Sequence, residues 1–124
     1  MRLRQYLVAF TLIALAACAD QAPPGSGTLS ATLVSPNGAE GSALVVLIGP
    51  GIGEISPLGD TELYSHAADG TAQVLLINQA GGELAFLVTL ADTTAKPEWV
   101  VEEVAGPDDE LRLLTGDYEL ELRR

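Results

Sequence analysis

Thr28-Leu29-Ser30-Ala31-Thr32-Leu33 alternates polar and apolar residues with a period of two. This period places successive side chains on opposite sides of a β-strand, so one side is expected to be buried and the other to face solvent. The sequence Ser35-Pro36-Asn37-Gly38 follows almost at once and favours a turn. A short strand closed by turn residues is therefore the first structural unit that the chain predicts.

Turn residues divide the rest of the chain into further short segments. Ala43–Ile48 is a continuous apolar run rich in β-branched residues, which favours a central strand. Gly49–Gly59 carries four Gly and two Pro and is expected to be a loop, with at most a brief extended piece at Glu54–Ser56. The other expected strands are Glu62–His66, Thr71–Asn78, Glu83–Ala91, Trp99–Val104, Leu111–Leu114 and Tyr118–Leu122.

The spacing of these segments predicts the fold class. No segment joins a helix cap to a long run of helical period. Glu83–Ala91 also matches a helical stripe, but the Gly81-Gly82 pair before it and its strand-like neighbours favour a strand. About seven to nine short strands at regular spacing predict an all-β domain, an antiparallel β-sandwich, over residues 28–124.

The first 17 residues have the three parts of a secretory signal. Arg2 and Arg4 form a positive end, Leu7–Leu15 is apolar, and two small residues precede the only cysteine. The apolar stretch is shorter than the about 20 residues of a membrane-spanning helix. We expect residues 1–17 to be removed as a signal peptide and residues 18–27, which contain Pro and Gly, to follow as a flexible tether.

The tetrapeptide Leu15-Ala16-Ala17-Cys18 resembles the lipobox of bacterial lipoproteins. The resemblance implies that Cys18 becomes the mature N-terminus and carries a thioether-linked diacylglyceryl group, often with a further acyl group on its amino end. Two or more acyl chains anchor a protein stably to a membrane. Ala19, rather than Asp, follows the cysteine, and the same resemblance then favours the outer membrane in a bacterium that has two membranes.

Residues 114–120, Leu-Thr-Gly-Asp-Tyr-Glu-Leu, resemble the tyrosine corner of immunoglobulin-like and fibronectin-type sandwiches. The resemblance implies that the hydroxyl group of Tyr118 hydrogen-bonds to the backbone of the turn before it. In those folds another strand follows the corner, so Tyr118 either opens the last strand of a variant topology or the likeness is accidental. Cohesin-type sandwiches, which are protein-docking modules, share the general architecture, but no motif assigns the chain to them.

The charge of the mature chain excludes one class of partner. After removal of residues 1–17, four basic residues remain against 17 acidic ones, a formal net charge of −13. Such a charge repels the phosphates of nucleic acids and anionic lipid surfaces. We therefore expect no nucleic-acid binding, and solubility is the simplest reason for the acidic surface.

Nucleophilic catalysis has little support. His66 is the only histidine, so any Ser-His-Asp arrangement would have to use it. It closes an expected edge strand and is expected to face solvent. The sequence Gly49-Pro50-Gly51-Ile52-Gly53 lacks the Lys-Ser/Thr of a phosphate-binding loop. We expect it to be a sharp connection between two sheets, with Ile52 as an apolar tip.

The sequence gives little support to metal or sugar binding. One Cys and one His are too few for a zinc site. Calcium takes oxygen ligands, so Asp108-Asp109-Glu110 together with Asp92 or Asp60 stays open as a calcium site. Sugar binding calls for aromatic platforms, and a lone Trp such as Trp99 is more often a partly buried packing residue.

Taken together, these features predict a lipid-anchored, non-enzymatic protein of the bacterial cell envelope that binds or scaffolds another envelope protein or a surface polymer. We expect no catalytic residue, cofactor-binding residue or metal ligand, and Cys18 as the one modified residue. The expected contact regions are the Gly49–Gly59 loop and the exposed face around Trp99. The alternatives are a small-ligand or calcium-binding envelope lipoprotein and, less favoured, a small hydrolase that uses His66.

Overall fold

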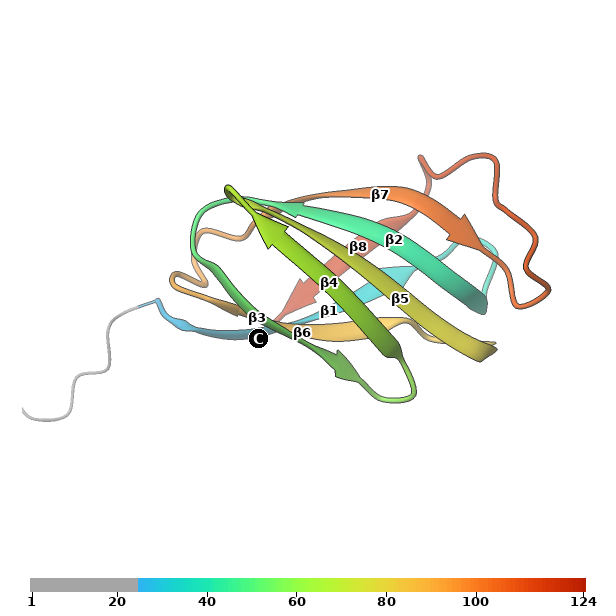
Figure 1. The fold of residues 1–124 in the computed structure, drawn as a ribbon, viewed down its shortest axis with the longest axis horizontal. Coiled ribbons are helices and arrows are strands. Elements are labelled where there is room, and N and C mark those ends of the chain that lie inside the picture. Colours follow the sequence, from blue (N-terminus) through green and yellow to red (C-terminus); the bar gives the residue numbers. More distant parts are fainter. Residues whose placement is uncertain (1–24) are drawn as a thin grey trace, which may run out of the picture.

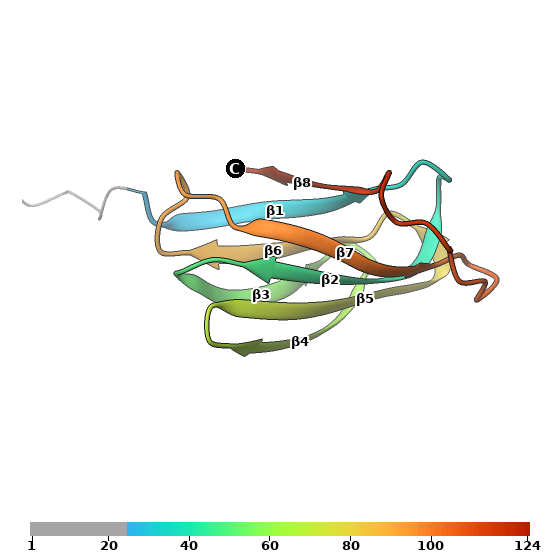
Figure 2. The ribbon, with the colours of Figure 1, turned by 90° about the horizontal axis from the view of Figure 1, so that it is seen from above.

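The computed structural model of the protein describes residues 25–124, which form eight strands and no helix. The strands lie in two antiparallel four-stranded sheets that pack face to face, with orders β3-β6-β1-β8 and β4-β5-β2-β7 (Figures 1 and 2). The expected all-β antiparallel sandwich is confirmed. The strands are β1 (Gly27–Val34), β2 (Glu40–Ile48), β3 (Ile52–Leu58), β4 (Glu62–Ala68), β5 (Thr71–Gly82), β6 (Ala85–Leu90), β7 (Glu98–Ala105) and β8 (Glu119–Arg123).

The N-terminal predictions fall on a part of the chain that the structure does not describe. The signal peptide at residues 1–17, Cys18 and the tether up to residue 24 lie outside the described residues. Gly27, which was assigned to the tether, is the first residue of β1. Residues 25–124 include no helix that is long and apolar enough to cross a membrane.

The core lies between the two sheets and follows the period-two pattern of the sequence. In β1, Leu29 and Ala31 are fully buried and Leu33 nearly so, while the residues between them face outward. The other sheet contributes alternate residues of β2 and β5 to the same core. The largest side chains that are almost completely buried include Phe86, Leu29, Leu47, Leu76, Leu84, Leu90, Val45, Val74, Val88 and Val104.

Most of the expected strands and turns are present. The apolar run Ala43–Ile48 belongs to β2, which lies inside its sheet between β5 and β7. The sequence Gly49-Pro50-Gly51 is a sharp connection between the two sheets, as predicted, and Gly51 has a positive φ of 76° that favours glycine. The helical alternative for residues 83–91 is wrong, since β6 occupies Ala85–Leu90.

The prediction of a loop over Gly49–Gly59 is wrong for most of its length. Residues 52–58 form β3, an edge strand paired with β6. Ile52 is not an apolar tip, because both Ile52 and Ile55 are half-buried against the core. An edge strand tolerates Pro57, whose missing N–H group is not needed on the unpaired side, so the Gly and Pro content misled the prediction.

Two other boundaries also differ from the sequence prediction. β5 continues to Gly82 through a register irregularity opposite β2, so the tight connection expected at residues 80–82 lies instead at residues 83–84. Leu111–Leu114 is not a strand, because only an isolated bridge joins Leu111 to Ala105. Residues 106–118 form a loop in which Leu113 and Leu114 are 91% and 84% exposed.

Candidate binding surface

The outer side of the β4-β5-β2-β7 sheet carries several apolar side chains. Pairing across the sheet aligns Tyr64, Leu75, Leu44 and Glu103 in one row. The next row consists of His66, Gln73, Val46 and Val100, and the row after it ends with Ile48 and Glu98. We name the outward side chains Leu44, Val46, Ile48, Tyr64, Leu75 and Val100 the apolar face.

These side chains are accessible to solvent. Tyr64 is 61% exposed and Val100 is 47% exposed, while Leu44 and Val46 are half-buried by their neighbours in the same sheet. Adjacent strands lie about 4.8 Å apart and successive rows on one side about 7 Å apart, so the six side chains form one continuous patch. A patch of this kind on a protein surface is typical of an interaction site.

The sequence of β2 explains how the apolar face arises. Alternate side chains of a strand point to opposite sides, and Ala43, Val45 and Leu47 point into the core. Since the run is apolar throughout, Leu44 and Val46 must then point outward. An uninterrupted apolar strand is typical of sheets that are covered on both sides. Here the core covers one side, and no described residue forms a layer over the other (Figure 2).

The loop at residues 106–118 extends the apolar face at one end. Leu111 is 55% exposed and lines a shallow depression together with Leu44 and Leu75. The loop lies at the end of the sandwich opposite to the point where residue 25 enters β1 (Figure 1). The apolar surface therefore runs along β2 from Ile48 to Leu44 and continues to Leu111 in the loop.

A buried carboxylate holds this loop in place. Glu40, at the start of β2, is 1% exposed. Its Oε1 atom accepts hydrogen bonds from Nε and Nη2 of Arg112 at 3.1 and 3.0 Å. Its Oε2 atom accepts hydrogen bonds from the hydroxyl groups of Ser35, at 3.1 Å, and of Tyr118. Because both carboxylate oxygens have partners, the desolvation cost of the buried charge is offset.

The electrostatics of this cluster support a structural role. The hydrogen bonds to Glu40 raise the pKa of the Arg112 guanidinium above its usual value. The hydroxyl group of Tyr118 also accepts a hydrogen bond of 2.9 Å from the side chain of Asn37. The cluster thus joins the turn after β1, the start of β2, and the middle and the last residue of the 106–118 loop.

Tyr118 lies directly before the last strand, β8, as one of the two sequence interpretations required. Its hydroxyl group hydrogen-bonds to the side chains of Glu40 and Asn37, and not to the backbone of the preceding turn as the tyrosine corner implied. Its backbone N–H does donate to the carbonyl of Thr115 at 3.2 Å. The residue therefore fixes a corner, but through a carboxylate that the sequence analysis had not singled out.

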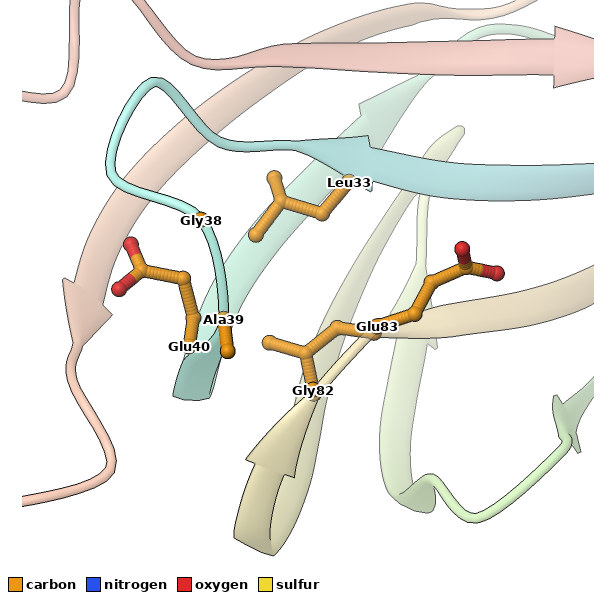
Figure 3. Close-up of a pocket in the computed structure, with 7 residues that line it drawn as sticks. Leu33, Gly38, Ala39, Glu40, Gly82 and Glu83 are labelled. Atoms are coloured by element: carbon orange, nitrogen blue, oxygen red, sulfur yellow. The ribbon is translucent and has the colours of Figure 1, made fainter.

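A second depression, of about 290 Å³, lies beside this cluster and is lined by Leu33, Ala39 and Leu84 among others. Figure 3 shows that the carboxylates of Glu40 and Glu83 point away from each other on either side of it. Binding sites for small molecules bring a few polar groups together within an apolar pocket. This depression has apolar walls without such a convergence.

Trp99 and His66 lie on the two opposite edge strands of the sheet, β7 and β4. Trp99 is half-buried against the core, and the exposed residue beside it is Val100. The expected contact region around Trp99 is therefore centred on its neighbour. His66 is exposed on edge strand β4, at the margin of the apolar face. No hydrogen bond or ion pair within residues 25–124 joins it to a Ser, Asp or Glu.

The acidic residues considered for calcium do not gather. Asp92 follows β6 and accepts hydrogen bonds from the N–H and hydroxyl groups of Thr94 at 2.9 and 2.6 Å, which lower the pKa of its carboxyl group. Asp108 belongs to the 106–118 loop, and Figure 1 shows this loop at the opposite end of the sandwich from the connection between β6 and β7. The described part of the chain contains no group of three or more His, Cys, Asp or Glu side chains placed to hold a metal ion.

In comparisons with known proteins, no family model, curated protein or solved structure matches this chain. The apolar face was not identified from sequence, although the signal was present in the unbroken apolar run of β2 and in the apolar residues on both sides of β5. These patterns predict strands, but a sequence alone does not show which side of a strand stays uncovered.

Proposed function

We propose that the protein is a lipid-anchored, non-enzymatic binding module of the bacterial envelope, and that it holds another envelope protein against its apolar face. The observation that carries this proposal is the exposure of Tyr64, Val100 and their neighbours on one side of the β4-β5-β2-β7 sheet. The lipobox-like sequence that ends in Cys18 supports the anchor.

The chemistry of the face favours a protein partner over a polysaccharide. Five of its six members are aliphatic, and Tyr64 is the one aromatic side chain among them. Sugar rings stack on aromatic platforms, whereas aliphatic patches bury favourably against other aliphatic side chains. The alternatives of a calcium protein and of a His66 hydrolase have no comparable observation in their favour.

Site-specific photocrosslinking tests the binding surface. A benzophenone amino acid is introduced at position 100 of the full chain in living cells, and at position 32 as a control on the opposite sheet. We expect a discrete crosslinked product from position 100 and little from position 32. Equal yields from both positions, or none from either, would contradict the proposed binding surface.

Replacement of the cysteine tests the anchor independently. The resemblance to a lipobox implies that Cys18→Ala leaves the precursor uncleaved and without lipid. Metabolic labelling with a fatty acid, followed by mass spectrometry of the N-terminus, measures both effects. Normal processing of the Cys18→Ala chain would overturn the anchor and leave the question of the binding surface untouched.

A further inference from the structure

We infer that the partner on the apolar face is a protein whose contact surface has an apolar centre and a basic rim. This inference rests on the proposed function and adds the chemical class of the partner. It depends on the charges that surround the apolar face, on the positions of the molecule's own cations, and on the size of the patch.

The rim of the apolar face is acidic along β7 and at the start of β4, and the rest of the β4 side carries His66. By strand register, Glu103 lies beside Leu44 and Glu98 beside Ile48 on β7. Glu102 is exposed at the register irregularity between them, and Glu62 is exposed at the start of β4. The four strands of this sheet contain no Lys or Arg. The carboxylates of the rim therefore have no basic partner within their own sheet.

The basic residues of residues 25–124 lie elsewhere and already have partners. Lys96 donates to the carbonyl oxygen of Leu122 on β8 at 3.4 Å. Arg112 is bound to Glu40, Arg123 forms an ion pair with Glu121, and Arg124 donates to Thr93 at 3.0 Å. None of the four is positioned in the sheet that carries the apolar face, so an approaching partner meets uncompensated negative charge there.

The size of the patch makes the rim part of any stable contact. The apolar face is four strands wide, at about 4.8 Å a strand, and three rows long, at about 7 Å a row. Its area is therefore roughly 400 Å². A specific protein interface covers about 800 Å² on each partner. The contact must therefore extend beyond the apolar centre, and the nearest surface to which it extends contains Glu98, Glu102 and Glu103.

Charge complementarity then decides among the possible occupants. A second copy of the chain packed on this face would bring two acidic rims together, which opposes association. Anionic lipid headgroups would meet the same repulsion. A protein surface with Lys or Arg around an aliphatic centre both buries the apolar side chains and pairs with the carboxylates, so it is the occupant that fits.

The test repeats the crosslinking from position 100 of the full chain in two charge-matched pairs of variants. One pair is Glu98→Gln/Glu103→Gln and Glu98→Lys/Glu103→Lys on the rim. The other pair is Glu119→Gln/Glu121→Gln and Glu119→Lys/Glu121→Lys on the outward side of β8. Each rim variant has the same net charge as the β8 variant with the same substitutions. Circular dichroism confirms that all four variants are folded.

We expect the rim glutamine variant to lower the crosslink yield roughly two- to ten-fold and the rim lysine variant to lower it further, while the β8 variants leave it unchanged. Sequencing of the crosslinked peptide should identify a segment of another protein that carries Lys or Arg beside apolar residues. A crosslink that is insensitive to the rim charges, or one to a second copy or to an acidic segment, would overturn the inference and leave the binding surface standing. The absence of any product from position 100 would remove the proposed function itself.

Discussion

The two outer sides of the sandwich face the same solvent but differ in chemistry. On the β3-β6-β1-β8 sheet, the outward side chains are mainly hydroxyl and charged groups, and we call this side the polar face. Three apolar side chains interrupt it: half-buried Leu87 and exposed Leu58 lie in neighbouring rows on β6 and β3, and exposed Val34 lies apart from Leu58 on β1. On the other sheet, the outward side chains form the continuous apolar face. The polar face comprises Thr28, Ser30, Thr32, Thr89, Glu119, Glu121 and Arg123.

The difference shows that the fold does not require the apolar face. Both sheets supply the same kind of aliphatic side chains to the core. The outer side of the other sheet is covered by polar groups, such as the hydroxyl groups of Thr28 and Thr89, which form a hydrogen bond of 3.3 Å. An exposed apolar patch adds the risk of aggregation to a folded protein. A surface that the core does not need and that carries this risk is most simply explained by binding.

The strongest test of this comparison contrasts neighbouring positions of β2. Leu47 is completely buried, so Leu47→Ala should lower the free energy of unfolding by about 2–5 kcal/mol. Leu44 points to the apolar face, so Leu44→Ala should cost less than about 1.5 kcal/mol. Urea unfolding of the two variants measures the difference. Equal losses would mean that the apolar face is covered in the free protein and is not an open surface.

A smaller loss of stability is expected when the buried carboxylate of Glu40, which binds the 106–118 loop, is replaced. Glu40→Gln keeps the shape but weakens the hydrogen bonds from Arg112 and Tyr118, and should cost about 2 kcal/mol. Amide hydrogen exchange over residues 106–118 should become faster, since the loop that carries Leu111 loses its attachment. Unchanged exchange in the Glu40 variant would show that other contacts hold the loop.

Glu121→Gln on the polar face breaks an exposed ion pair with Arg123 and should change the free energy of unfolding by no more than about 1 kcal/mol.

The comparison also explains which parts of the molecule could be predicted from sequence. The fold class, the core of β1 and the interior position of β2 follow from period-two patterning and from the apolar run, both of which are local. The strand β3 was missed, because Gly53 and Pro57 suggest a loop until the pairing with β6 and the burial of Ile55 are known. The role of Glu40 depends on Arg112 and Tyr118, more than 70 residues away in the chain, and no local pattern reports such a contact.

Exchanging the chemistry of the two faces should exchange their affinity for an apolar dye. Leu44→Thr/Leu75→Thr reduces the apolar face, and the fluorescence of bound Nile red should fall a few-fold, because the dye binds to contiguous apolar surface. Ser30→Val/Thr32→Val on the polar face should raise it, because these outward side chains lie beside Leu87. Titration of the dye at constant protein concentration measures both changes. A signal that is independent of all four substitutions would place the apolar surface elsewhere, for instance at Leu113 and Leu114.

The smallest expected effect concerns the loop that joins β6 of one sheet to β7 of the other, away from both faces. Hydrogen bonds from Thr94 lower the pKa of Asp92 below its ordinary value of 3.8. A carboxyl group whose pKa is lower in the folded than in the unfolded protein adds stability above its unfolded pKa and loses it as the pH falls through its folded pKa. Thr94→Ala should therefore lower the melting temperature slightly at pH 7, and the difference should shrink as the pH falls below 3.8 and through the lowered pKa of the folded protein. A difference that keeps its size as the pH falls would show that Thr94 acts through packing, and the loop would then connect the two sheets without any contribution from the charge of Asp92.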